Sequence, residues 1–97
     1  MYGTIARMRL KDGAEPEFKR QLEEFTARAV GGFRQTLIYR MDADSNELMM
    51  VVVFDDKESY FKNAEDPAQN EEYEQLRALL TDDPEWNDGE IVMDARP

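Results

Sequence analysis

The sequence of 97 residues contains no cysteine and no histidine. The absence of cysteine excludes disulfide bonds, thiolate metal sites and a cysteine nucleophile. The absence of histidine excludes every acid–base scheme that depends on imidazole, and it removes a common ligand of zinc and heme. Any chemistry of this protein therefore has to come from the remaining polar side chains.

Long apolar runs and positive charge are also scarce. No stretch approaches the roughly 20 apolar residues that a membrane helix needs, and the first ten residues alternate as a strand does, without the apolar core of a signal peptide. The chain has 12 Lys and Arg against 22 Asp and Glu, a net charge of −10. We therefore expect a cytoplasmic protein that binds neither nucleic acid nor membrane, since both carry negative charge.

What is present suits a single globular domain over residues 1–97. Hydrophobic residues make up 41% and charged residues 35% of the chain, which is typical of folded, soluble proteins. Alternation and apolar runs predict strands at 2–10, 33–41, 47–54 and 90–95. Apolar spacing predicts helices at 14–30, within 55–66 and at 67–81.

Several local signals are expected to bound the helices. Asp12 with Glu15, and Asp55 with Glu58, have the spacing of a capping box. Asp66-Pro67 is typical of a helix start, and the glycine pair at 31–32 is expected to stop the first helix.

The order β-α-β-β-α(α)-β predicts a ferredoxin-like α+β sandwich. Four antiparallel strands would lie in the order 4-1-3-2, with the helices on one face of the sheet. The strand at 47–54 is apolar on both faces, so helices on one side leave about three large side chains exposed on the other. Leaving each of them exposed rather than buried costs roughly 1.5–3 kcal/mol. We therefore expect a homodimer that packs through the open sheet face.

These features resemble the antibiotic biosynthesis monooxygenase-like (ABM) domain of the dimeric α/β-barrel superfamily. The resemblance spans nearly the whole chain. It is carried by the first strand and its "DG" turn, by "GGFRQTLIYRMD", and by "VVFDDKESYFKNAEDPAQNEEYEQLRALL" before the last strand. It implies a dimer whose two sheets form a closed barrel, with a pocket between sheet and helices in each subunit.

The resemblance also implies an activity. Some members oxygenate aromatic polyketides without metal or flavin, so the chain is expected to act, with no cofactor and no metal, on a small aromatic or quinol-type substrate whose anion activates O₂. Heme-degrading members use a His, an Asn and a Trp near the second helical region. Here Asn63 lies in that region, but histidine is absent and Trp86 comes much later, so heme degradation is not expected.

Candidate site residues come from the second strand and the later helices. Polar groups in an apolar pocket orient a phenol. Tyr39 and Asn63 are expected to make the catalytic contacts, and Gln35, Tyr60 and Tyr73 to bind the substrate. The alternative for each tyrosine is a buried ring whose hydroxyl is hydrogen-bonded at the rim.

Two questions stay open at this stage. Four arginines are expected on the strand faces away from the helices, either binding an anionic ligand inside the dimer barrel or pairing with acids of the partner subunit at the sheet margin; they are Arg7, Arg9, Arg34 and Arg40. The second question is whether the protein is an enzyme or a non-enzymatic homodimeric module that binds a small ligand or has a structural role. A pocket filled by Tyr and Leu side chains would favour the module, and an open pocket with unpaired polar groups would favour the enzyme.

Overall fold

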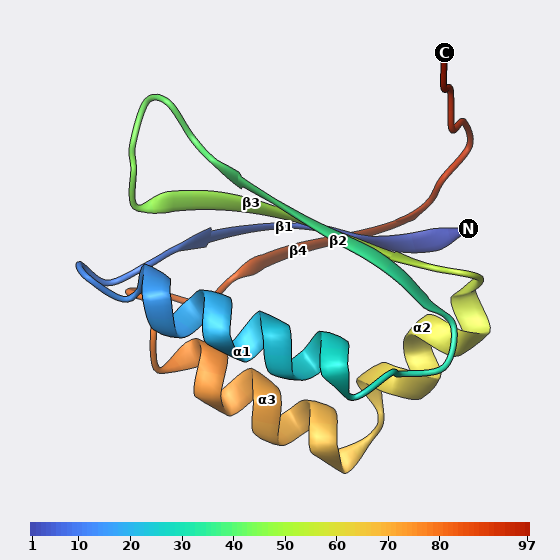
Figure 1. Ribbon diagram of the computed structural model, residues 1–97, viewed down its shortest axis with the longest axis horizontal. Helices are drawn as coiled ribbons and strands as arrows, with labels where there is room; N and C mark the ends of the chain where they lie inside the picture. Colours follow the sequence, from blue (N-terminus) through green and yellow to red (C-terminus); the bar gives the residue numbers. More distant parts are fainter.

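The computed structural model describes residues 1–97 as one four-stranded sheet with three helices (Figure 1). The elements are β1 (Tyr2–Arg9), α1 (Glu15–Ala27), β2 (Phe33–Arg40), β3 (Glu47–Phe54), α2 (Lys57–Ala64), α3 (Pro67–Arg77) and β4 (Glu85–Glu90). The strands lie in the order β2-β3-β1-β4, and every neighbouring pair is antiparallel. The predicted ferredoxin-like α+β fold and its strand order are confirmed.

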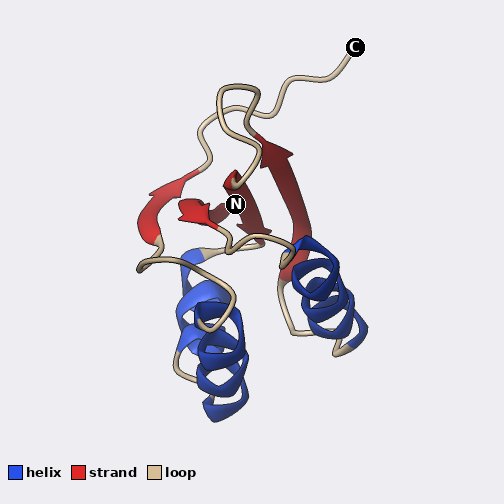
Figure 2. Ribbon diagram, turned by 90° about the vertical axis from the view of Figure 1, so that its left-hand side faces the viewer, coloured by secondary structure: helices blue, strands red, loops and turns tan.

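All three helices cover the same face of the sheet, and the chain after β4 leaves on the other side (Figure 2). The core lies under the helices, where the alternation of β1 and β3 places their even-numbered residues. The buried cluster consists of Ala6, Met8, Leu10, Phe18, Leu48, Met50 and Leu80. None of the three helices has the length and apolar character that a bilayer crossing requires.

The opposite face of the sheet is apolar and uncovered. The side chains of Ile5, Leu37 and Tyr39 are 50%, 44% and 56% exposed, and they surround the half-buried Val51 of β3. β3 is apolar on both faces and the helices cover only one of them. The single chain therefore has the uncovered apolar surface that its sequence predicts.

A β-bulge changes the side-chain parity of β2. Phe33 pairs with Phe54 but Gln35 pairs with Val53, so Arg34 is the extra residue. An extra residue in one strand sends every later side chain to the other face. Phe33 consequently faces the helices, whereas Gln35 and Tyr39 lie on the open face. Simple alternation along the predicted strand 33–41 would have placed all three residues on one face, and the bulge prevents this.

The helix caps are partly as predicted. Asp66 accepts a hydrogen bond from Ala68 N at 2.8 Å and starts α3, with Pro67 as its first residue. At α2 the cap is Asp56 instead of Asp55, and it accepts from Ser59 N at 2.8 Å. At α1 no side chain caps the helix. The expected capping boxes are therefore wrong at both of these helices: the neighbouring acid Asp56 takes the cap position at α2, and Ala14 occupies it at α1.

Asp12, the cap expected for α1, accepts instead from Asn46 Nδ2 at 2.7 Å. It thus links the turn after β1 to the β2–β3 turn.

The first helix ends four residues before the predicted glycine stop. Its last residue is Ala27, and Ala29 already adopts a left-handed φ of 52°. Gly32 has a φ of 82°, and its carbonyl accepts from Asp55 N at 2.8 Å. The glycine therefore shapes the entry into β2 rather than the end of α1.

The last strand lies earlier than predicted. β4 is the polar segment Glu85–Glu90, and all six of its residues are exposed. It is an edge strand that pairs only with β1, with Trp86 opposite Ala6 and Asp88 opposite Thr4. The apolar stretch at 90–95 suggested a strand, but the backbone pairing with β1 decides the position, and Val92 remains 90% exposed.

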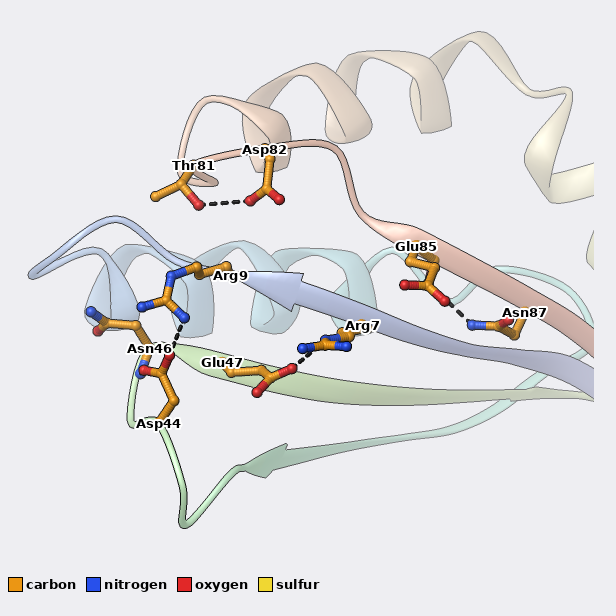
Figure 3. A network of polar contacts seen from close by, with 9 residues as sticks. All are labelled: Arg7, Arg9, Asp44, Asn46, Glu47, Thr81, Asp82, Glu85 and Asn87. Atoms are coloured by element: carbon orange, nitrogen blue, oxygen red, sulfur yellow. Dashed lines mark hydrogen bonds and ion pairs between the residues drawn. The ribbon is translucent and has the colours of Figure 1, made fainter.

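The four strand arginines all find acids within their own chain. Arg7 pairs with Glu47 and Arg9 with Asp44 on the open face (Figure 3). Arg34 pairs with Asp55, and Arg40 pairs with Glu15. The expected open-face position is therefore correct for Arg7 and Arg9 and wrong for Arg40, which the bulge turns toward α1.

Two of these arginines lower the pKa of the carboxyl group with which they pair. The hydrogen bond from Arg40 lowers the pKa of Glu15, and that from Arg9 lowers the pKa of Asp44. Pairing within the subunit leaves these arginines without a need for acids of a partner.

Candidate functional site

A cavity of about 420 Å³ lies between the sheet and the helices. This volume falls within the range of small-molecule sites, which are mostly apolar with a few polar groups. Twelve of the 20 lining residues are hydrophobic. The eight polar lining residues are Thr4, Gln21, Thr36, Asn63, Gln69, Asn70, Glu72 and Asp88, and the hydroxyls of Tyr60 and Tyr73, which are counted among the hydrophobic residues, add two polar groups.

Tyr60 of α2 is bonded across the cavity to Asp88 of β4. The Tyr60 hydroxyl donates to Asp88 Oδ1 at 2.8 Å. Its ring makes edge-on contacts with Tyr2 and Phe54, at centroid distances of 5.3 Å and 5.6 Å. Burial raises the pKa of Tyr60, and the hydrogen bond and charge of Asp88 raise it further. Tyr60 is therefore a neutral hydrogen-bond donor at neutral pH rather than a base.

Asn63 of α2, a residue of the cavity wall, carries an unpaired acceptor. Its Nδ2 donates to Gln69 Oε1 at 3.3 Å, while its Oδ1 is buried and has no hydrogen-bond partner in the protein. A buried carbonyl without a donor costs about 1–3 kcal/mol. A ligand hydroxyl that donates to Asn63 Oδ1 would remove that cost.

Thr4 of β1 carries the second unpaired group. The residue is 5% exposed, and its Oγ1 lacks a partner with hydrogen-bond geometry. It is near enough to the Tyr60 hydroxyl to offset part of the rise in the Tyr60 pKa. Both unpaired buried side-chain atoms of the protein thus belong to residues that line this cavity.

Tyr73 and Trp86 form an aromatic wall between α3 and β4. Their rings lie 6.3 Å apart at an interplanar angle of 45°. Trp86 is 43% exposed, so it reaches from the cavity toward solvent. Planar ligands stack on such aromatic surfaces.

The ionisable lining groups are two carboxylates and two tyrosines, without lysine or arginine. Glu72 is paired to Arg28 at 2.7 Å, and Asp88 accepts from Tyr60. No group of three or more carboxylates comes together in a way that could hold a metal ion. Asp88 is therefore the carboxylate of the cavity wall that carries no ion pair.

A protein-family model matches most of the chain. The family model described as antibiotic biosynthesis monooxygenase matches residues 1–70. The chain belongs to the antibiotic biosynthesis monooxygenase family. No curated protein matches the sequence, but many solved structures share the fold.

Three of these structures illustrate the similarity. A mutant of SnoaB, a cofactor-independent oxygenase from Streptomyces nogalater, is 20% identical with a TM-score of 0.80, over 96% of this chain and 94% of that one. A conserved protein from Methanosarcina mazei Go1 is 17% identical with a TM-score of 0.78, over 91% and 89%. Rv0793 from Mycobacterium tuberculosis is 18% identical with a TM-score of 0.76, over 98% of both chains. At these identities the likeness establishes the fold that the monooxygenase family shares.

Within this family fold, the structure brings together three of the five predicted site residues. Tyr60, Asn63 and Tyr73 all line the cavity. Gln35 and Tyr39 do not, because the bulge at Arg34 places them on the open face. The predicted position of these two residues in the pocket is wrong.

Asp88 and Thr4 also line the cavity and were not among the predicted site residues. Asp88 lies between the predicted helix that ends at residue 81 and the predicted strand at 90–95, where no helix or strand was expected. Thr4 lies in the predicted first strand. Alternation shows which residues share its face of the sheet, but it cannot show that the Thr4 hydroxyl lacks a hydrogen-bond partner. The pairing of β1 with β4, which sets Thr4 opposite Asp88, is the signal that joins them, and it becomes visible only in the folded chain.

Proposed function

We propose that the protein is a cofactor-independent monooxygenase that acts on a small aromatic or quinol-type substrate in the cavity between the sheet and the helices. The observation that carries the proposal is an open, mostly apolar cavity whose residues include both unpaired buried polar atoms. Membership of the monooxygenase family supports the same reaction class. The likeness to SnoaB, a cofactor-independent oxygenase, adds support from the fold.

In the proposed reaction, the substrate supplies the electrons. A phenol first loses its hydroxyl proton, and the phenolate then transfers an electron to O₂. The resulting superoxide and substrate radical combine to form a carbon–oxygen bond. Cleavage of the peroxide O–O bond leaves one oxygen atom in a quinone product, and the other leaves as water with the two hydrogens that the substrate gave up.

The cavity residues have distinct roles in this scheme. Asn63 Oδ1 accepts a hydrogen bond from a substrate hydroxyl and fixes its position. Asp88 is the proton acceptor, held in place by the Tyr60 hydroxyl. Tyr73 forms an aromatic surface for the ring, together with Trp86. Tyr39 takes no part in the scheme, because its side chain lies across the sheet from the cavity.

The proposal includes a homodimer formed through the open sheet face. The uncovered side chains of Ile5, Leu37 and Tyr39 support this assembly, since burying apolar surface of this kind stabilises a complex by about 25 cal/mol per Å². The ion pairs of Arg7 and Arg9 border the apolar surface and are already satisfied within one chain. A second copy related by a twofold axis would cover the apolar side chains without leaving these charges unpaired.

Oxygen uptake with a panel of hydroquinones and polyketide phenols tests the activity. Heat-denatured protein is the blank. Ala64 lines the cavity from an exposed position on α2, so Ala64→Trp should fill the cavity and abolish uptake. Ala27→Trp, at the exposed end of α1, is the matched control and should keep it.

Uptake no greater than that of the blank with every compound would reject the enzyme for these substrates. Ligand binding without uptake would favour the alternative, a non-enzymatic module that binds a small ligand.

A further inference from the structure

We infer that this cavity selects ligands that arrive uncharged and rejects those that carry a carboxylate. The inference concerns the charge of the ligand, and it rests on the proposed function only in taking this cavity as the ligand site. It follows from the charges that the fold places around the cavity.

Acids are the only charged groups in the cavity wall. Glu72 of α3 and Asp88 of β4 line it, and none of the chain's twelve lysines and arginines does. Asp88 has a neutral phenol as its partner, so its charge is not neutralised. An anionic group beside Asp88 would meet repulsion that grows as water leaves the site.

Two cations that contact residues of the cavity wall are already engaged. Arg28 pairs with Glu72 at 2.7 Å and lies over the Phe25 ring, 5.5 Å from its centroid. Lys57 Nζ lies 5.9 Å from the ring centroids of Tyr2 and Phe61. Neither cation is a lining residue, so an anionic ligand would have to break an existing contact to reach one. The net charge of −10 opposes the approach of an anion as well.

The unpaired polar atoms point to the same ligand class. Asn63 Oδ1 can only accept a hydrogen bond, so it requires a donor such as a hydroxyl. A carboxylate has no hydrogen to donate and would face both this oxygen and Asp88. A neutral phenol can donate to Asn63 Oδ1 on binding and keeps its proton until it is inside the cavity.

The test compares two ligands of nearly equal size that differ in charge, hydroxynaphthoic acid and its methyl ester. Binding of each is measured by calorimetry at pH 7 under argon, so that no turnover occurs. We expect the ester to bind at least ~10-fold more tightly than the acid, a difference of about 1.4 kcal/mol. The preference should weaken in high salt, because Asp88 is exposed on one side.

Asp88→Asn tests the contribution of the negative charge of Asp88 separately from its hydrogen bond. Asparagine keeps an oxygen that accepts from Tyr60, so the hydrogen bond to α2 is retained while the negative charge is lost. The ratio of the two dissociation constants should fall by about threefold or more. Asp42→Asn in the β2–β3 turn removes one charge at a site outside the cavity and should leave the ratio unchanged.

Three results would overturn the inference: binding of the acid as tightly as the ester, an unchanged ratio in Asp88→Asn, or binding of neither ligand. The proposed activity is judged separately by oxygen uptake. A preference for the ester without uptake from any hydroquinone would leave the charge selection standing and reject the catalysis.

Discussion

The Tyr60 hydroxyl on α2 donates to Asp88 Oδ1 on β4 at 2.8 Å and so joins a helix to the edge strand across the cavity. Tyr60→Phe removes this bond and leaves the ring in place. A hydrogen bond of this kind contributes about 1 kcal/mol to the free energy of unfolding, and we expect a loss of that size in urea denaturation. Tyr73→Phe is the matched control, because the Tyr73 hydroxyl has no hydrogen-bond partner in the protein. An equal loss in both variants would contradict the assignment.

The same pair predicts a dependence of stability on alkaline pH. The folded state holds the pKa of Tyr60 above its ordinary value of about 10. As the pH rises past that value, the unfolded chain releases this proton first, so the free energy of unfolding falls. Between about pH 9 and pH 11, the wild type should lose more stability than Tyr60→Phe. Parallel losses measured by urea denaturation would show that Tyr60 is not the group responsible.

Gly32 occupies a position that no other residue tolerates well. Its φ is 82°, and a Cβ there would lie 2.5 Å from Ser59 Cβ at the start of α2. Gly32→Ala should therefore cost about 1–3 kcal/mol of unfolding free energy. Gly31→Ala is the control, because a Cβ at Gly31 meets nothing within 4 Å, and its effect should stay within about 0.5 kcal/mol. Similar effects of the two substitutions would count against the described approach of β2 to α2.

The homodimer is tested by a charge on the open face. Leu37 is 44% exposed in the single chain, so Leu37→Lys should fold normally but place an unpaired charge in the proposed interface. Light scattering at micromolar concentration should give a dimer mass for the wild type and a monomer mass for the variant. Ala27→Lys, on the exposed end of α1, should remain a dimer. A monomeric wild type would refute the proposed assembly.

Much of the fold could be predicted from local patterns. The apolar run Leu48–Phe54 predicted a strand, and its predicted range, 47–54, is the observed one. The stripe with Phe18 and Leu22 identified α1, and the Asp66-Pro67 pair placed the start of α3. These signals succeeded because each arises from residues that are neighbours in the chain.

The bulge and the last strand could not be predicted in this way. Phe33, Leu37 and Tyr39 are all apolar enough for either face of β2, so the sequence contains no sign that the parity changes at Arg34. The segment Glu85–Glu90 has the polar composition of a turn, and it becomes a strand because β1 offers free backbone groups at the sheet edge. These two differences explain why Gln35 and Tyr39 were assigned to the cavity and Asp88 was not.

The most direct test of the account is turnover with isotopically labelled O₂, using a hydroquinone or phenol that the protein binds and no added flavin or metal. We expect one labelled oxygen atom in the quinone product and the other in water. The label should be lost from the product in Asn63→Leu, which keeps the size of the side chain but removes the acceptor. A product without label, or equal labelling by wild type and Asn63→Leu, would contradict the assignment of this cavity as an oxygenase site.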